Sequence, residues 1–289
     1  MFPEVKNSGI DKYAFLEEAA REMRGDCLRM GLAAGREGIH LGGAFSCIEM
    51  LAALYLKVMK RAPEESDRPY EDRFILSKGH AAPALYAAMR QVGLVAEDEL
   101  DMFKGDSAFL SGHPSRNVER GIDFSSGSLG QGLSLAVGVC LAARLKEEDY
   151  RTFVVLGDGE CDEGSVWEAA MAAAHYGLGN LVAIVDANVL QYDGATGDVM
   201  SLGDLPTKWG AFGWEVEEID GHDFSQVVPA LERRSDIPRA IIARTVKGKG
   251  ASFAENARAW HHAKLTEPLY LQALCDLGLG EEEVCNGIR

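Results

Sequence analysis

The residues whose chemistry is easiest to define are an aspartate and an asparagine about 30 positions apart. Asp158 lies between Gly157 and Gly159, and Asn188 ends the triplet D-A-N. A carboxylate and an amide oxygen are hard ligands that suit Mg²⁺ or Ca²⁺, and either ion would keep open positions for phosphate oxygens. The two glycines would let the backbone approach such a ligand closely. The triplet G-D-G alone is a common turn, so the prediction of a site depends on the pair.

The segments around this pair predict one β-α-β unit. Residues 153–156 and 181–185 are short apolar runs rich in β-branched residues, typical of buried strands, and Asp186 is expected to end the second. Residues 163–176 are rich in Ala, Glu and Met and precede Gly177, as expected for a helix with a C-terminal glycine. Asp158 and Asn188 would then lie just past the carboxyl ends of two strands. In an open α/β sheet, ligands bind at that edge.

The rest of the chain continues this alternation. Helices are expected over residues 11–32, 46–59, 83–92 and 133–145. Strands are expected over residues 73–77, 214–219 and 239–244, and a further helix follows the strand 214–219 and ends at about residue 234. This order predicts an α/β fold with one doubly wound, mostly parallel sheet and helices on both faces. No change in composition marks a boundary. Residues 1–289 are therefore expected to form a single domain with an N-terminal helical segment and a short C-terminal tail.

A glycine-rich turn precedes the apolar helix expected over residues 133–145. The turn spans residues 126–132 and has the sequence S-G-S-L-G-Q-G. At such a turn the backbone N–H groups and the positive end of the helix dipole would face a bound anion. The turn is therefore a second candidate for an element that binds phosphate.

Four of the seven histidines lie in glycine-rich or strand-end loops: His40, His80, His113 and His261. One loop histidine is usually a solvated side chain, but four are harder to dismiss. A site that handles polyols needs neutral donor-acceptor groups and a proton shuttle near pH 7, and imidazole supplies both. His175, inside a predicted helix, and His222, in a predicted turn, are interpreted as structural.

The composition excludes several classes of function. The formal net charge is −16 and no basic stripe is present, which argues against nucleic acid or an anionic membrane as the main partner. No apolar run reaches the length of a membrane span, and the N-terminus does not resemble a signal peptide. The six cysteines are scattered without a C-x-x-C pair, so buried or free thiols are expected, with neither a disulfide framework nor a zinc site. A soluble, cytoplasmic protein is expected.

The motifs together resemble transketolase. The resemblance is carried by G-D-G-x-x-x-E-G, D-x-N-x-x-Q-x-D-G, L-S-K-G-H, S-G-H-P, S-S-G-S-L-G-Q-G-L-S and T-V-K-G-K-G, and it runs from about residue 11 to about residue 270. It covers only the half of a transketolase that binds the diphosphate of thiamine diphosphate. The family's other half supplies the aminopyrimidine pocket, the glutamate that activates the cofactor and the residues that hold a sugar phosphate.

The resemblance implies roles for particular residues. Asp158, Asn188 and the backbone carbonyl of Leu190 would hold Mg²⁺ or Ca²⁺ against the cofactor diphosphate. His40, His113 and His261 would contact sugar hydroxyls and assist proton transfer. The cofactor would also be contacted by His80, Gly127, Ser128, Leu129, Gly130, Gly157, Asp158, Gly159, Glu163, Asn188 and His261.

Three positions depart from the family pattern. Val189 stands where many members have glycine, which is expected to change the loop conformation without touching a ligand atom. Ile39 separates Gly38 from His40, whereas the family often has Gly-His-x-Gly-Gly. His261 and His262 form a doublet, and the preceding tryptophan favours His261 as the active member.

The function implied is that of the N-terminal subunit of a split transketolase, which transfers a two-carbon ketol unit from a ketose or ketose phosphate donor to an aldose acceptor. Such a protein would need a separate, pyrimidine-binding C-terminal subunit, by resemblance in an α₂β₂ heterotetramer. Two alternatives stay open: the α subunit of a 2-oxoacid dehydrogenase E1 component, which uses the same metal motif, and a non-catalytic regulatory relic of the cofactor site.

Overall fold

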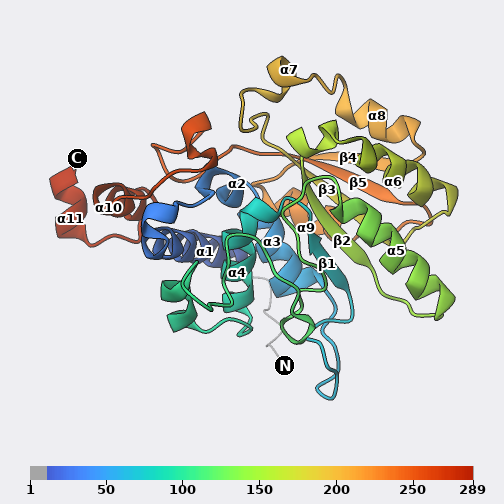
Figure 1. The fold of residues 1–289 in the computed structure, drawn as a ribbon, viewed down its shortest axis with the longest axis horizontal. Helices are drawn as coiled ribbons and strands as arrows, with labels where there is room; N and C mark the ends of the chain where they lie inside the picture. Colours follow the sequence, from blue (N-terminus) through green and yellow to red (C-terminus); the bar gives the residue numbers. More distant parts are fainter. Residues whose placement is uncertain (1–11, 289) are drawn as a thin grey trace.

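Five parallel strands form the centre of the fold in the order β1-β2-β3-β5-β4 (Figure 1). The computed structural model describes residues 12–288. The strands are β1 (Arg73–Leu76), β2 (Thr152–Gly157), β3 (Leu181–Ala187), β4 (Glu215–Asp220) and β5 (Arg239–Arg244). Because every neighbouring pair is parallel, all the carboxyl ends lie at one edge of the sheet. The predicted doubly wound α/β fold is confirmed.

The central strands are apolar on both faces, as expected for a parallel sheet covered by helices on each side. In β2, Phe153 and Val155 face one hydrophobic core, and Val154 and Leu156 face the other. The register pairs Gly157 of β2 with Asp186 of β3. This pairing places the two predicted strand ends side by side.

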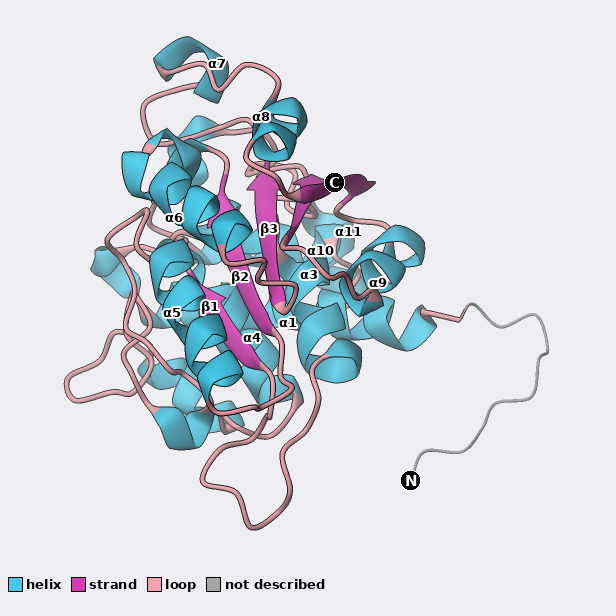
Figure 2. Cartoon of the chain, turned by 90° about the vertical axis from the view of Figure 1, so that its right-hand side faces the viewer, coloured by secondary structure: helices cyan, strands magenta, loops and turns pink. Residues whose placement is uncertain are grey.

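Helices cover both faces of the sheet (Figure 2). The core on one face includes residues of α5 (Gly132–Leu145), α6 (Gly164–His175) and α8 (Leu205–Ala211). The core on the other includes residues of α1 (Ala14–Ala33), α2 (Leu41–Phe45), α3 (Ile48–Ala53), α4 (Ala82–Gln91) and α9 (Phe224–Glu232). The strand order reverses between β4 and β5, and α9, which connects them, accordingly packs on the opposite face from α6.

The remaining elements are short or lie at the periphery. A π-helical turn (Leu54–Val58) extends α3, and α7 (Thr196–Val199) lies in the connection from β3 to β4. The 3₁₀ turns are Gly35–Glu37, Gly79–Ala81, Glu97–Met102, Val118–Arg120, Gly159–Asp162 and Arg258–His261. Helices α10 (Glu267–Asp276) and α11 (Glu282–Ile288) follow at the C-terminal end (Figure 1).

Most of the predicted elements are present, with shifted ends. The helix expected from residue 11 begins at Ala14, and Asp11 lies outside the described residues. Strand β3 continues through Asp186 to Ala187, so Asp186 does not end it. Gly177 has a φ of 56° directly after the last helical turn of α6, in agreement with its predicted capping role. Helices α2, α7, α8, α10 and α11 were not predicted.

The cysteines require a correction. Cys275 and Cys285 form a disulfide that joins α10 to α11, so the expectation of free thiols is wrong for these two residues. The two cysteines are 10 residues apart, and α10 and α11 bring them together. The spacing of the cysteines in the sequence does not predict this pairing. The other four cysteines are free and buried, as expected: Cys27, Cys47, Cys140 and Cys161. Among the described residues, no helix is both long and apolar enough to span a membrane.

Candidate active site

Polar side chains from four neighbouring strands meet at the carboxyl edge of the sheet. Lys78 follows β1, Asp158 follows β2, Asn188 follows β3 and Thr245 follows β5. Parallel strands bring these positions together although they are far apart in the sequence. The predicted location of the site at this edge agrees with the geometry.

Asp158 is a buried carboxylate without a direct ion-pair partner in the described part of the chain. It is 5% exposed. Its two oxygens accept hydrogen bonds from the backbone amides of Gly159 (2.8 Å) and Val189 (2.6 Å). Burial, followed by the nearby charge of Asp186, raises the pKa of Asp158 to about 6. The Lys78 ammonium opposes this rise in the pKa but forms no ion pair with Asp158, so a cation at this position would supply a direct counter-charge.

Val189 has a left-handed backbone, with φ of 58°. This conformation is unfavourable for a β-branched residue. The expectation that this position touches no ligand atom is wrong, because its amide donates directly to Asp158. The bond that orients the predicted metal ligand therefore depends on a strained residue.

Replacing Val189 with glycine is expected to stabilise the chain by about 1 kcal/mol, since glycine adopts this φ without steric cost. The measurement is urea unfolding of the isolated chain. Val199→Gly is the matched control: Val199 is a similarly exposed valine at the end of α7, where glycine should destabilise slightly. If Val189→Gly destabilises as much as Val199→Gly, the loop is not strained.

Asn188 is held by a fully buried carboxylate. Its Nδ2 donates to Asp186 Oδ2 at 2.9 Å, and its Oδ1 accepts from the amide of Leu190 at 3.2 Å. Asp186 also accepts from three further side chains: Ser46 (2.6 Å), Lys78 and Thr245. Burial alone would raise the pKa of Asp186, but the Lys78 ammonium and these hydrogen bonds hold it below its usual value. Asp186 therefore remains ionised and fixes which way the Asn188 amide points.

The carbonyl of Leu190 accepts a hydrogen bond from Lys247 Nζ at 2.9 Å. Lys247 is 2% exposed, and burial, together with the charge of Lys78, lowers its pKa to about 8. The same Nζ lies 3.4 Å from Nδ1 of His261. Lys247 thus connects the third predicted metal ligand to the histidines.

These residues fit a divalent cation held jointly with a phosphate ligand. Among the described residues, no group of three or more His, Cys, Asp or Glu side chains could hold a metal. A metal here would therefore depend on the Asp158 carboxylate, the Asn188 amide, a backbone carbonyl and oxygens of the ligand itself. Gln191 Oε1, against Gly159, is buried without a hydrogen-bond partner, as expected beside a polar ligand.

The glycine-rich turn is held in an unusual conformation. Gly127 has φ of 143° and Gly130 has φ of 80°, and a Cβ on Gly79 would lie 2.7 Å from the Gly127 amide. Only some of the amides of the turn are free to face a ligand, as the sequence predicts for its backbone N–H groups. Gly130 N donates to Glu160 and Gly132 N donates to Ser77. Within the described part of the chain, the amides of Gly127, Ser128 and Leu129 are left without a protein acceptor and remain available to an anion.

Glu160 is a buried acid that sequence reasoning missed. It is 2% exposed and accepts hydrogen bonds from the amides of Gly130 (2.8 Å) and Gly157 (3.1 Å) and from the hydroxyl of Ser77. Burial raises its pKa above the usual value. Glu160 thereby joins the ends of β1 and β2 to the glycine-rich turn. Glu163, the acid that was predicted, is exposed at the N-terminal cap of α6.

The four predicted histidines form one cluster. The ring of His40 lies at the centre, with centroids 5.6 Å from His80, 5.8 Å from His113 and 5.6 Å from His261. His80 and His261 stack at 5.1 Å. His262 also joins the cluster, so the doublet contributes both of its rings.

The clustered imidazoles are neutral near pH 7. Burial first, and then the neighbouring His262, lower the pKa of His40 to about 3. Burial and the Lys247 ammonium lower the pKa of His261 to about 4. The pKa values of His80 and His113 are also lowered, chiefly by burial. Each ring therefore offers one hydrogen-bond donor and one acceptor, as a polyol site requires.

We expect the cluster to make the chain less stable in acid. The unfolded chain would protonate these histidines near pH 6.5, but the folded chain does so only near pH 3 to 4, so the free energy of unfolding should fall as the pH drops from 6.5 to 4. Asp26 and Asp158 act in the opposite direction, since burial raises their pKa to about 6.

Urea unfolding at pH 7 and pH 5 should therefore be compared between variants. The loss on acidification should shrink in His40→Gln and stay unchanged in His175→Gln, whose ring is exposed on α6. Equal losses in both variants would refute this account.

His222 lies outside the cluster but supports it. Its Nε2 accepts from the amide of Val246 at 2.9 Å, and its Nδ1 lies 3.0 Å from Glu49, which pairs with Arg24. This network fixes the loop that carries Lys247. The structural interpretation of His222 agrees with this geometry.

Four buried charged residues of the site were not predicted as such: Lys78, Glu160, Asp186 and Lys247. Lys78 follows a predicted strand, and Asp186 was placed at the end of another. Their positions at the carboxyl edge of the sheet could therefore have identified both as site residues. Lys247 follows β5 in the same way. Glu160 lies two residues past Asp158, and no periodic pattern marks it.

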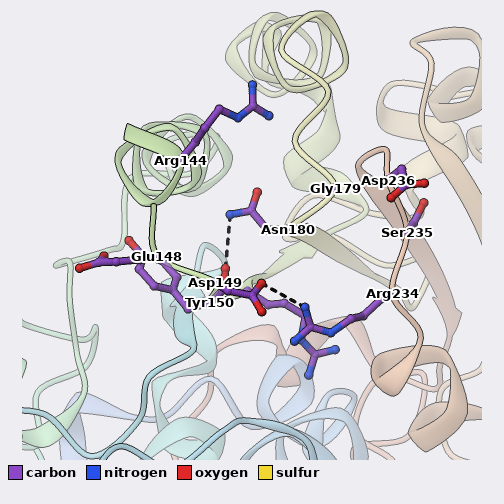
Figure 3. Close-up of a pocket in the computed structure, with 10 residues that line it drawn as sticks. Arg144, Glu148, Asp149, Tyr150, Gly179, Asn180, Arg234, Ser235 and Asp236 are labelled. Atoms are coloured by element: carbon purple, nitrogen blue, oxygen red, sulfur yellow. Dashed lines mark hydrogen bonds and ion pairs between the residues drawn. The ribbon is translucent and has the colours of Figure 1, made fainter. Parts of the chain in front are cut away.

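A surface pocket of about 520 Å³ lies at the opposite edge of the sheet (Figure 3). Its walls include residues directly before β2 and β3, among them Tyr150, Arg151 and Asn180. Arg234 pairs with Asp149 (Figure 3). Arg144 donates to the backbone carbonyl of Gly177. Its charges are thus largely satisfied within the protein, and it contains none of the predicted site residues.

The fold and site define a thiamine diphosphate binding domain. Residues 23–284 match the family model described as "Transketolase, thiamine diphosphate binding domain". The chain therefore belongs to the transketolase family.

Two curated relatives are similar over most of their length. One, from Phocaeicola vulgatus, is named as one of the subunits of an apulose-4-phosphate transketolase, and it is 41% identical over 81% of this chain and 84% of its own. The "6-deoxy-6-sulfo-D-fructose transketolase subunit SqwG" of a Clostridium species is 43% identical over 84% of this chain and 90% of its own. The solved transketolase of Leishmania mexicana superposes with a TM-score of 0.82 at 27% identity, over 95% of this chain but 44% of that one.

These comparisons confirm the predicted family. They also confirm the interpretation of the chain as the N-terminal subunit of a split, thiamine-dependent transketolase over its two alternatives. The naming of the relatives as subunits implies a partner chain. The chain spans less than half of the solved transketolase.

Proposed function

We propose that this chain holds the diphosphate end of thiamine diphosphate through Mg²⁺ or Ca²⁺ and positions a sugar for transfer of a two-carbon ketol unit. Asp158, Asn188 and the Leu190 carbonyl are the proposed metal ligands. When bound, the cofactor supplies the ylid and the electron sink of the reaction. The unpaired carboxylate of Asp158 beside Asn188 is the observation that carries this proposal.

The chain's own residues would then orient the ligands and move protons. The free amides of the 127–129 turn face the diphosphate side, with His80 and Gly157 to Gly159 beside it. His40, His113 and His261 are the proposed contacts for sugar hydroxyls. As neutral imidazoles they can take a proton from a hydroxyl and return it. The low pKa of each ring keeps it neutral in the resting site.

The proposed substrates are a ketose or ketose phosphate donor and an aldose acceptor. The two relatives named for apulose 4-phosphate and 6-deoxy-6-sulfo-D-fructose support a donor with an anionic end group. We also propose that residues 1–289 form a single domain. A cytoplasmic location is proposed as well: the four buried free thiols are compatible with it, whereas the Cys275–Cys285 disulfide is unusual for a reducing compartment.

The proposed partner is a separate pyrimidine-binding chain in an α₂β₂ assembly. Several large apolar side chains are exposed on the turn, on α5 and α6, and along residues 189–200: Leu129, Leu145, Met171, Tyr176, Val189, Tyr192, Val199 and Met200. We propose that the partner covers part of this surface, because a contiguous exposed apolar patch normally marks an interface. Glu163 is exposed at the start of α6, where it could reach a partner chain.

Titration calorimetry of the chain with thiamine diphosphate tests the proposal. Binding should be measurable with Mg²⁺ or Ca²⁺ and should be lost when the metal is removed with a chelator. The same titration with thiamine, which lacks the diphosphate, should give no metal-dependent heat. Absence of metal-dependent binding would favour the relic interpretation.

A further inference from the structure

The second histidine of the doublet has the closest ring contact described in the cluster. The centroids of His262 and His40 are 4.4 Å apart, against 5.6 Å for His261 and His40. The contact is built into the backbone. Ile39 and Ala263 exchange both amide hydrogen bonds, at 2.9 and 3.1 Å, which places the residues beside them next to each other. The close approach is therefore a feature of the fold and does not depend on one side-chain rotamer.

Gly38 makes room for this arrangement. Its φ is 66°, and a Cβ at this position would lie 2.9 Å from the Ala263 carbonyl and 3.1 Å from the His262 ring. Lys104 holds the same segment by donating to the Gly38 carbonyl at 2.8 Å. These contacts hold the 37–40 loop, Lys104 and His262 together at one side of the histidine cluster.

The imidazoles are ordered from the buried edge of the sheet toward solvent. His80 and His261 lie nearest Lys78 and Lys247, whose charges act on both rings. His113 and His262 are exposed, and the charge of Lys104 acts on both of them. His40 lies between the two groups. The cluster therefore has an inner end at the proposed cofactor site and an outer end at Lys104.

We propose that His262 determines substrate specificity by hydrogen bonding to the part of the sugar farthest from the transferred ketol unit. This inference rests on the proposed function. The proposed diphosphate site, at Asp158 and Asn188, is at the inner end. The thiazolium that carries the transferred unit would extend from the diphosphate toward the imidazoles, and the rest of a ketose would extend further outward to His262. A neutral ring at the outer end can donate to one sugar hydroxyl and accept from another. A ketose donor that is too short to reach His262 should therefore be used equally well with or without this ring.

The test uses the chain together with its partner, thiamine diphosphate and Mg²⁺. Ketol transfer is measured from fructose 6-phosphate, with six carbons, and from erythrulose, with four. His262→Ala should lower kcat/KM for fructose 6-phosphate about tenfold, chiefly through KM, because the neutral hydrogen bonds of this ring are lost. The value for erythrulose should stay nearly unchanged. His262→Gln, which keeps a donor and an acceptor, should recover most of the loss. His175→Ala, on the exposed face of α6, is the control and should match the wild type with both donors.

The other outcomes are distinguishable. Equal losses with both donors, or no loss with either, would overturn the specificity role. A fall in the melting temperature or in cofactor affinity of His262→Ala, with no change in donor preference, would show that the ring is structural. If the wild-type assembly transfers a ketol unit from neither donor, the proposed function has failed and the inference fails with it.

Discussion

Replacing Asp158 with alanine should abolish metal-dependent binding of thiamine diphosphate. The variant removes the one buried carboxylate that faces the proposed metal, so the diphosphate charge would meet an uncompensated site at a cost of several kcal/mol. A loss of that size weakens binding by at least about a hundredfold. Titration calorimetry with Mg²⁺ present measures it directly.

Two further variants make this result interpretable. Asp158→Ala also removes the acceptor for two backbone amides, so the loop could rearrange. Asp158→Asn keeps one acceptor oxygen and should still lose metal-dependent binding. Asp193→Ala removes an exposed carboxylate from the same loop and should bind like the wild type. Cofactor binding by Asp158→Ala at wild-type affinity would disprove the metal assignment.

Replacing His261 or His113 with alanine should slow the complete enzyme by roughly 10² to 10⁴, the usual range for lost acid–base assistance. His261 stacks on His80 and lies beside Lys247, and His113 packs on the central His40. Neither ring forms a described hydrogen bond to Asp158 or Asn188, so metal-dependent cofactor affinity should stay close to the wild-type value. His261, which the resemblance also places in contact with the cofactor, should show the larger change of the two. Steady-state turnover and cofactor titration are measured on the same preparations.

His175→Ala is the control for both variants, since it removes an exposed histidine from α6. Its turnover should equal that of the wild type. If His261→Ala and His113→Ala also turn over normally, these side chains are structural. If cofactor binding falls in parallel with turnover, the rings hold the cofactor and the assignment to proton transfer is wrong.

The fold could be predicted from the sequence because its signals are local. The apolar runs of β2 and β3 and the glycine after α6 each depend on neighbouring residues only. The same holds for Asp158 and Asn188, which directly follow those strands. Short helices such as α7 and α8 lack enough periodic residues to be recognised.

The missing parts of the site depend on contacts between distant segments. Lys78 and Asp186 form a buried ion pair across 108 positions, and Glu160 meets Ser77 across 83. No spacing rule predicts such pairs. The left-handed backbone of Val189 could not be predicted either, because valine rarely adopts a positive φ.

The most direct test of the split-enzyme account is turnover of the purified chain with and without its partner. The cofactor has two ends, and the site proposed at Asp158, Asn188 and the 127–129 turn would hold only the diphosphate end. Supplied with thiamine diphosphate, Mg²⁺, a ketose donor and an aldose acceptor, the chain alone should show no ketol transfer. Adding the proposed pyrimidine-binding partner subunit should restore transfer. Substantial turnover without that partner would contradict the account.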